Sequence, residues 1–180
     1  MNTERTQQIL ETFGNKVIAR ARVILNQKNR NASGDLSAGL GFKVNVFPSG
    51  ALEMDFKAPD YADFVDKGVR GSTGKPHPKR GMLAKDSPYK YGSKMPPVGK
   101  IDKWTVRKGL KDVRDERGRF IKRKSLVFGI AKSIQLYGLP ASHFFTDAFN
   151  ENYKDLPDQL IKAYANDVEK FLQFATKNMR

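Results

Sequence analysis

The chain has 180 residues, a formal net charge of +14, 39% hydrophobic residues and no cysteine. This length suits one domain with a sizeable core, and the lack of cysteine excludes a disulfide framework, a thiolate zinc site and a cysteine nucleophile. The sequence holds neither a signal-peptide pattern nor a run of about 18 apolar residues that could span a bilayer. We therefore expect a soluble protein without a membrane part, made where it is used.

The first predicted element is an amphipathic helix over residues 3–26. Apolar residues at three-four spacing draw one stripe along it: Ile9, Leu10, Phe13, Val17, Ile18, Ala21, Ile24 and Leu25. The polar, turn-rich residues 26–35 should end this helix.

A β-hairpin with one buried face is predicted next. Apolar and polar residues alternate over 42–46 and again over 52–56, on both sides of the turn Pro48-Ser49-Gly50. A short helix over residues 61–67 should follow, closed by Gly68 in the left-handed conformation.

The positive charge lies in one part of the chain, residues 67–124, which we call the basic segment. It holds 19 Lys and Arg against 5 Asp and Glu, whereas the rest of the chain holds 14 of each kind. Its first part, residues 69–98, is rich in Gly and Pro and predicts a long loop with little capacity to pack. Such a segment implies a polyanionic neighbour, either nucleic acid or an acidic protein surface.

The remaining elements are mainly helical. A short helix should run from Pro96-Pro97 to about Leu110, and a charged, hairpin-like stretch over 112–124 should turn at Arg117-Gly118. A helix over 125–137 should end at Gly138, and Ser142 can cap the short helix that follows.

The last helix should begin at Asp155 or Asp158 and run to about Lys177. Its inward residues are predicted to be Leu160, Ile161, Tyr164, Val168, Phe171, Leu172 and Phe174. The fold class is therefore α+β: a small antiparallel hairpin-based sheet packs against long N- and C-terminal helices. Residues 1–180 should form a single domain, with residues 69–124 as an extended basic insertion or arm within it.

No pattern in the sequence favours catalysis or a cofactor. His77 lies in the basic loop without an acidic residue nearby, and His143 stands at a helix start, so we predict no catalytic residue and no metal ligand. The glycines from Gly68 to Gly74 do not have the spacing of a phosphate-binding loop. A nuclease could use the acidic cluster Asp55, Asp60, Asp63 and Asp66, but we interpret Asp63 and Asp66 as the solvated face of a helix.

Contact with a charged partner is the remaining role for the basic segment. Aromatic residues are interleaved with its cations, which would allow stacking, but no sequence-reading motif accompanies them. The predicted electrostatic contacts to DNA or to a neighbouring subunit are Lys75, Lys79, Arg80, Arg107, Lys108, Arg119, Lys122 and Arg123. The predicted packing anchors are Tyr61, Phe64, Trp104, Phe144 and Phe145. An acidic helix over residues 60–66 could receive a neighbour's basic segment.

Three short motifs, in this order, resemble those of the tail-completion and head–tail joining proteins of tailed bacteriophages. The first, Ser33-Gly34-Asp35-Leu36-Ser37, precedes the hairpin. The second runs from Pro59 through Tyr61-Ala62 and Phe64-Val65 to Gly68, and the third from Gly138 through Phe144-Phe145 to Phe149. The stretch from Pro96 to Trp104 is similar to a variant of these proteins with a large insertion, and the likeness covers about residues 3–175.

The resemblance implies a structural virion protein of the phage neck without enzymatic activity or cofactor. It implies a homo-oligomeric ring, six- or twelve-fold, that joins the portal or adaptor to the tail around the DNA channel. Its partners would be other neck, portal or tail proteins, with non-specific contact to genomic DNA and none to membranes. The protein would reside in the virion, and in the host cytoplasm during assembly. The alternative is a non-specific nucleic-acid-binding protein that uses the basic segment.

Overall fold

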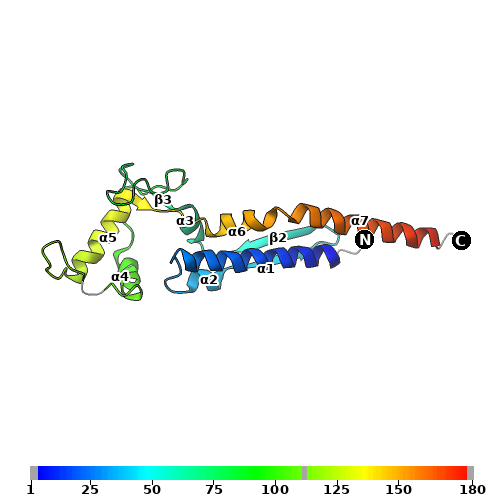
Figure 1. Ribbon diagram of the computed structural model, residues 1–180, viewed down its shortest axis with the longest axis horizontal. Coiled ribbons are helices and arrows are strands. Elements are labelled where there is room, and N and C mark those ends of the chain that lie inside the picture. Colours follow the sequence, from blue (N-terminus) through cyan, green and yellow to red (C-terminus); the bar gives the residue numbers. More distant parts are fainter. Residues whose placement is uncertain (1–3, 111–112, 178–180) are drawn as a thin grey trace. The chain divides into compact units, whose positions relative to one another are not determined.

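The structure, a computed structural model, describes residues 4–110 and 113–177, with side chains described as far as Glu169. It has the predicted α+β class (Figure 1). The chain divides into two compact units: unit 1 comprises residues 1–24, 37–59 and 144–180, and unit 2 comprises residues 25–36 and 60–143. That both belong to a single domain stays a prediction.

Unit 1 combines a hairpin with the two ends of the chain. Its elements are most of α1 (Glu4–Gln27), part of α2 (Asp35–Gly39), β1 (Gly41–Val46), β2 (Leu52–Lys57), α6 (Phe144–Tyr153) and α7 (Leu156–Lys177). The division between the units falls inside α1 and α2. Helix α1 confirms the N-terminal helix predicted over residues 3–26, except that residue 3 lies outside the described residues.

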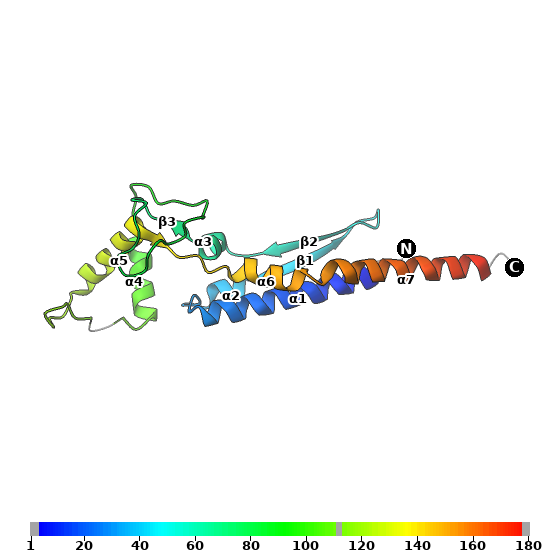
Figure 2. The same cartoon turned by 45° about the horizontal axis from the view of Figure 1, so that its top comes forward.

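The predicted hairpin, with its turn and its one buried face, is confirmed. Phe42 pairs with Phe56 and Val44 with Met54, so the half-buried side chains share one face. This face packs on α1 and α6 (Figure 2), where Phe56 lies 6.2 Å from Phe13 and 6.1 Å from Phe149 between ring centroids. The predicted apolar stripe of α1 is buried from Phe13 to Leu25, and its residues as far as Ile24 belong to the core of unit 1.

The prediction for α7 is only partly right. Ala163 is 1% exposed, yet Ile161 and Tyr164, which we expect to face inward, are 66% and 58% exposed. Only the side of the helix that carries Leu156 and Ala163 faces the core. The apolar stripe of α7 is therefore wider than the part that unit 1 covers. The predicted inward side chains beyond Glu169 lie outside the described side chains.

Unit 2 contains α3 (Ala62–Lys67), β3 (Val69–Arg70), α4 (Val98–Arg107), α5 (Arg123–Tyr137) and β4 (Gly138–Leu139). All three helices were predicted. Their observed ends lie within two residues of the predicted ends, except that α4 ends at Arg107 and not at about Leu110. The two-residue strands were not predicted: β3 pairs antiparallel with β4 in a second sheet.

The chain leaves unit 2 through a segment that is bonded to α3. The Ser142 hydroxyl donates to the Val65 carbonyl at 2.6 Å, and the capping of α6 by Ser142 stays a prediction. His143, at φ 49°, stands directly before the helix, and its backbone N–H donates to the Asp66 carbonyl. These bonds fix the segment to the end of α3.

Candidate contact surface

Nearly all the net charge lies in unit 2. Unit 2 carries 22 Lys and Arg against nine Asp and Glu, a balance of +13, while unit 1 carries 11 against ten, a balance of +1. Unit 2 thus has the composition of a surface for a polyanion, and unit 1 that of a neutral scaffold.

The basic segment begins where two strands approach unusually closely. A Cβ at Gly138 (φ 92°) would lie closer than 3.0 Å to the backbone of Val69, and one at Gly71 equally close to the backbone of Leu136. Only glycine allows this approach, which lets Ser72 N–H donate to the Gln135 carbonyl and continue the pairing onto α5.

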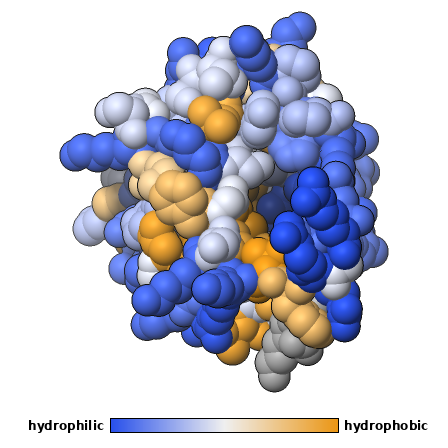
Figure 3. Space-filling model, turned by 90° about the vertical axis from the view of Figure 1, so that its left-hand side faces the viewer, coloured by the Kyte–Doolittle hydropathy of each residue, from blue (hydrophilic) through white to orange (hydrophobic). Residues whose placement is uncertain are grey.

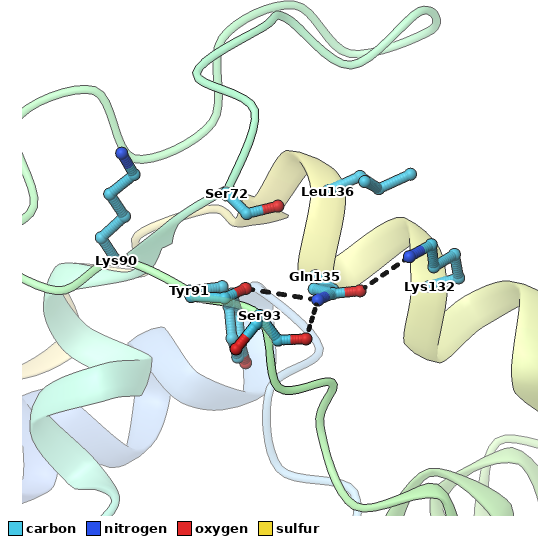
Figure 4. A pocket seen from close by; sticks show the side chains of 8 residues that line it. Ser72, Lys90, Tyr91, Ser93, Lys132, Gln135 and Leu136 are labelled. Atoms are coloured by element: carbon cyan, nitrogen blue, oxygen red, sulfur yellow. Dashed lines mark hydrogen bonds between the residues drawn. The ribbon is translucent and has the colours of Figure 1, made fainter.

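A buried glutamine then holds the next part of the segment. Gln135 is 5% exposed, and its side-chain amide donates to the carbonyls of Gly92 and Ser93, while its oxygen accepts from Lys132 Nζ at 3.0 Å (Figure 4). A shallow cavity of about 490 Å³ surrounds these bonds, lined also by Ser72, Lys90 and Tyr91. Sequence analysis missed Gln135, although a polar residue four positions after buried Ala131 on the same stripe is a signal for a buried, bonded amide.

Further bonds hold residues between these points. Ser87, 6% exposed, donates its hydroxyl to the Gly68 carbonyl, and Tyr89 donates its hydroxyl to Asp63 at 2.8 Å. His77 pairs with Gly81 through both backbone bonds. No helix or strand lies between β3 and α4, a stretch that the structure describes throughout, and most side chains of residues 69–98 are exposed, so the predicted long loop with little packing is confirmed. Side-chain-to-carbonyl bonds, and not a hydrophobic core, hold this loop.

The predicted hairpin-like stretch is present as a small basic finger over residues 113–121; Asp112 lies outside the described residues. Arg114 bridges to Phe120, and its guanidinium lies 4.0 Å above the centroid of that ring. The turn is closed by Asp115, whose carboxylate accepts from the backbone N–H groups of Arg117 and Arg119. These bonds, the Arg119 backbone first, lower the pKa of the Asp115 carboxyl. Phe120 is 61% exposed.

Helices α4 and α5 lie side by side and leave an apolar groove between them, with a cavity volume of about 910 Å³. Its lining includes Val98, Asp102, Arg123, Lys124, Val127 and Phe128. Two of these lining residues, Arg123 and Asp102, form a two-bond ion pair at 2.7 and 2.9 Å. Figure 3 shows hydrophobic residues exposed among hydrophilic ones on this part of unit 2.

The eight predicted basic contact residues differ in whether they already have a hydrogen-bond partner in the chain. Three have partners within unit 2: Lys108 donates to Asn29, Arg119 to Asp115 and Arg123 to Asp102. The other five are exposed and have no acidic partner within the described residues: Lys75, Lys79, Arg80, Arg107 and Lys122. Arg80 also lies near Arg30, whose pKa is lowered by burial and by this like charge.

The five predicted packing anchors fall into two groups. Phe144 is 1% exposed in the core of unit 1, and Phe145 lies 5.1 Å from Phe56 between ring centroids. Tyr61, Phe64 and Trp104 are 44%, 44% and 39% exposed in unit 2. These three therefore lie at the surface of their own chain.

The interpretation of the acidic helix needs correction. Asp66 is 4% exposed and does not lie on a solvated face. Asp63 is exposed but accepts from Tyr89 and Lys67, bonds that lower the pKa of its carboxyl in that order of strength. The helix over 60–66 is thus a weaker receptor for a neighbour's cations than its composition suggests.

The described residues contain no cluster of three or more His, Cys, Asp or Glu side chains placed to hold a metal ion. Among the helices in the described part of the chain, none is long and apolar enough to cross a membrane. No protein-family model, curated protein or solved structure matches the chain.

Proposed function

We propose that this chain is a structural protein of the neck of a tailed bacteriophage. Copies of it would assemble into a six- or twelve-fold ring that joins the portal or adaptor to the tail around the DNA channel. The virion would be its site of action, and other neck, portal or tail proteins its partners. The resemblance of the three short motifs to that family supports the proposal, and so do the charge and the exposed apolar side chains of unit 2.

The observation that carries the proposal is the concentration of charge in a unit held by its own hydrogen bonds. Unit 2 carries a balance of +13, and Gln135, Ser87 and Asp115 fix its loops. A surface that is already ordered loses little conformational entropy when it binds, which favours permanent contact with neighbours and with DNA phosphates.

Exposed apolar side chains on the same unit support assembly. Phe120, Phe128 and Met82 are each more than half exposed. Large exposed apolar groups rimmed by charge are typical of surfaces that become buried in a complex. A ring of copies would cover them through head-to-tail contacts.

The experiment is the native mass of the purified chain, alone and with the other neck proteins, followed by electron microscopy of the assembly. A ring of six or twelve copies is the expected result. A chain that stays monomeric with every neck partner would contradict the proposal.

A second candidate, a non-specific nucleic-acid-binding protein, is favoured by the five cations without acidic partners in the described residues. Its test is DNA retention as a function of salt, comparing wild type with Lys75→Ala/Lys79→Ala/Arg80→Ala. If each cation contacts a phosphate, the slope of log affinity against log salt falls by roughly 2.7. A control triple in unit 1 that removes the same charge, Lys16→Ala/Lys43→Ala/Lys57→Ala, should leave the slope unchanged. A monomer that shows this behaviour and never assembles would favour the second candidate.

A further inference from the structure

Helix α7 presents an apolar face that unit 1 leaves uncovered. Ile161 (66%) and Tyr164 (58%) are among the four most exposed large hydrophobic side chains of the described residues. They lie three positions apart, and half-buried Val168 follows four positions later, so the three form one stripe. Asp158 and Asp167 stand three positions before Ile161 and three after Tyr164, so carboxylates flank this stripe.

The α4–α5 groove of unit 2 has the opposite character. It is apolar inside, and Phe128 and Val98 at its surface are 53% and 41% exposed. At the end where α5 begins, Arg123 is paired with Asp102. Lys124 also lines the groove and Lys122 precedes it, so this end is net positive.

The first turn of α5 adds to this positive end. It contains no acidic residue, and Lys122 at the N-cap position makes no side-chain capping bond. The free N–H groups of a helix start and the helix dipole both favour a negative group at this place. The one carboxylate among the described lining residues, Asp102, is engaged with the Arg123 side chain, so a second carboxylate from outside could serve as a cap.

We propose that α7 of one copy binds in the α4–α5 groove of a second copy. The apolar stripe with Ile161 and Tyr164 covers Phe128 and Val98, and a flanking carboxylate, Asp158, lies at the lysine-bearing start of α5. This is the helix-in-groove mode of recognition, in which side chains at three-four spacing provide the anchors. The inference rests on the proposed function and specifies its subunit contact.

The contact is heterologous, because the two surfaces differ and each copy carries both. A heterologous contact closes into a ring when its rotation divides the circle, and otherwise continues as a filament. Its energy would come from the apolar anchors, while the carboxylate and the lysine set the direction and register of the helix.

Cross-linking between copies tests the contact. The chain has no cysteine of its own, so an introduced cysteine is the only thiol that the linker can react with. We would prepare Phe128→Cys and Ile161→Cys as separate proteins, mix them and add a short bismaleimide linker. A covalent pair of one copy of each is expected only in the mixture. The matched control replaces Ile161→Cys with Val23→Cys, since Val23 is 44% exposed on α1 and should give no such pair.

A charge exchange tests the register. Lys124→Glu or Asp158→Lys alone should weaken self-association, measured by sedimentation, and the double variant should restore it. Ile161→Asp should weaken it about tenfold or more, as expected for an interface anchor. Ile161 is exposed, so Ile161→Asp should not disturb folding, and circular dichroism checks this.

The outcomes separate this inference from the proposed function. Rings without the Phe128–Ile161 cross-link would overturn the contact and leave the neck function standing. A strictly monomeric chain would overturn both. If Phe128→Asp leaves the assembly unchanged but weakens DNA retention, the groove binds nucleic acid and the contact with α7 is wrong.

Discussion

The replacement Gln135→Met should release part of the basic segment from α5. Methionine keeps the length and the helical preference of glutamine but has no amide. The variant loses the two bonds that hold the segment, to the Gly92 and Ser93 carbonyls, and each is worth about 0.5–1.5 kcal/mol net. It also loses the bond from Lys132, which lies on α5 itself and does not hold the segment. We therefore expect unit 2 to lose about 1–3 kcal/mol of stability, and local opening at residues 90–94 to become roughly 5- to 150-fold more frequent.

Limited trypsin digestion measures this opening, because cleavage after Lys90 and Lys94 follows the population of the open form. Urea unfolding measured by the fluorescence of the chain's one tryptophan, Trp104 in unit 2, gives the stability. Gln159→Met is the matched control, since Gln159 is exposed on α7 and should show neither effect. Equal cleavage in Gln135→Met and wild type would refute the conclusion that this amide holds the segment.

Three other changes test separate parts of the structure. Gly138→Ala should cost more than about 2 kcal/mol, from positive φ and backbone contact together, and lower the melting temperature, whereas Gly129→Ala, which meets nothing within 4 Å, should not. Phe13→Ala in the aromatic core of unit 1 should cost about 3–5 kcal/mol by circular dichroism in urea, against less than about 1 kcal/mol for Phe47→Ala at the exposed hairpin tip. The lowered pKa of Asp63 means that its bonds stabilise the fold above the carboxyl's ordinary value near 3.8 and that this contribution is lost as pH falls through the folded value. The urea midpoint of wild type should thus drop more steeply on acidification than that of Asp63→Asn. If the two midpoints fell in parallel as the pH is lowered, the stabilising role of the Asp63 bonds would be contradicted.

Local patterns in the sequence were sufficient to predict the elements with strong periodicity. The alternation around Pro48-Ser49-Gly50 gave the hairpin, and the stripe from Phe13 to Leu25 gave the buried side of α1. Both depend on neighbours only a few residues apart, which is why a single sequence predicts them.

The parts that were missed depend on residues far apart in the chain. Strand β3 pairs with β4 through Val69 and Leu139, which are 70 positions apart in the sequence, and two-residue strands are too short to show a periodic pattern. The same holds for Gln135 and its carbonyl partners. For α7 the pattern identified apolar residues but not which of them unit 1 covers, since that depends on the width of the neighbouring surface.

The interleaved order of the two units has a consequence for biosynthesis. Phe13 and Phe56 leave the ribosome early, but Phe149, which completes their aromatic cluster, follows only after residues 60–143. At elongation rates of about 5–20 residues per second, the interval between Phe56 and Phe149 is roughly 5–19 seconds. During that time the apolar side chains of the first helix and the hairpin stay exposed to solvent, because α6 has not yet been made. Unit 2 can meanwhile complete its own folding, so that the middle of the polypeptide matures before its two ends meet.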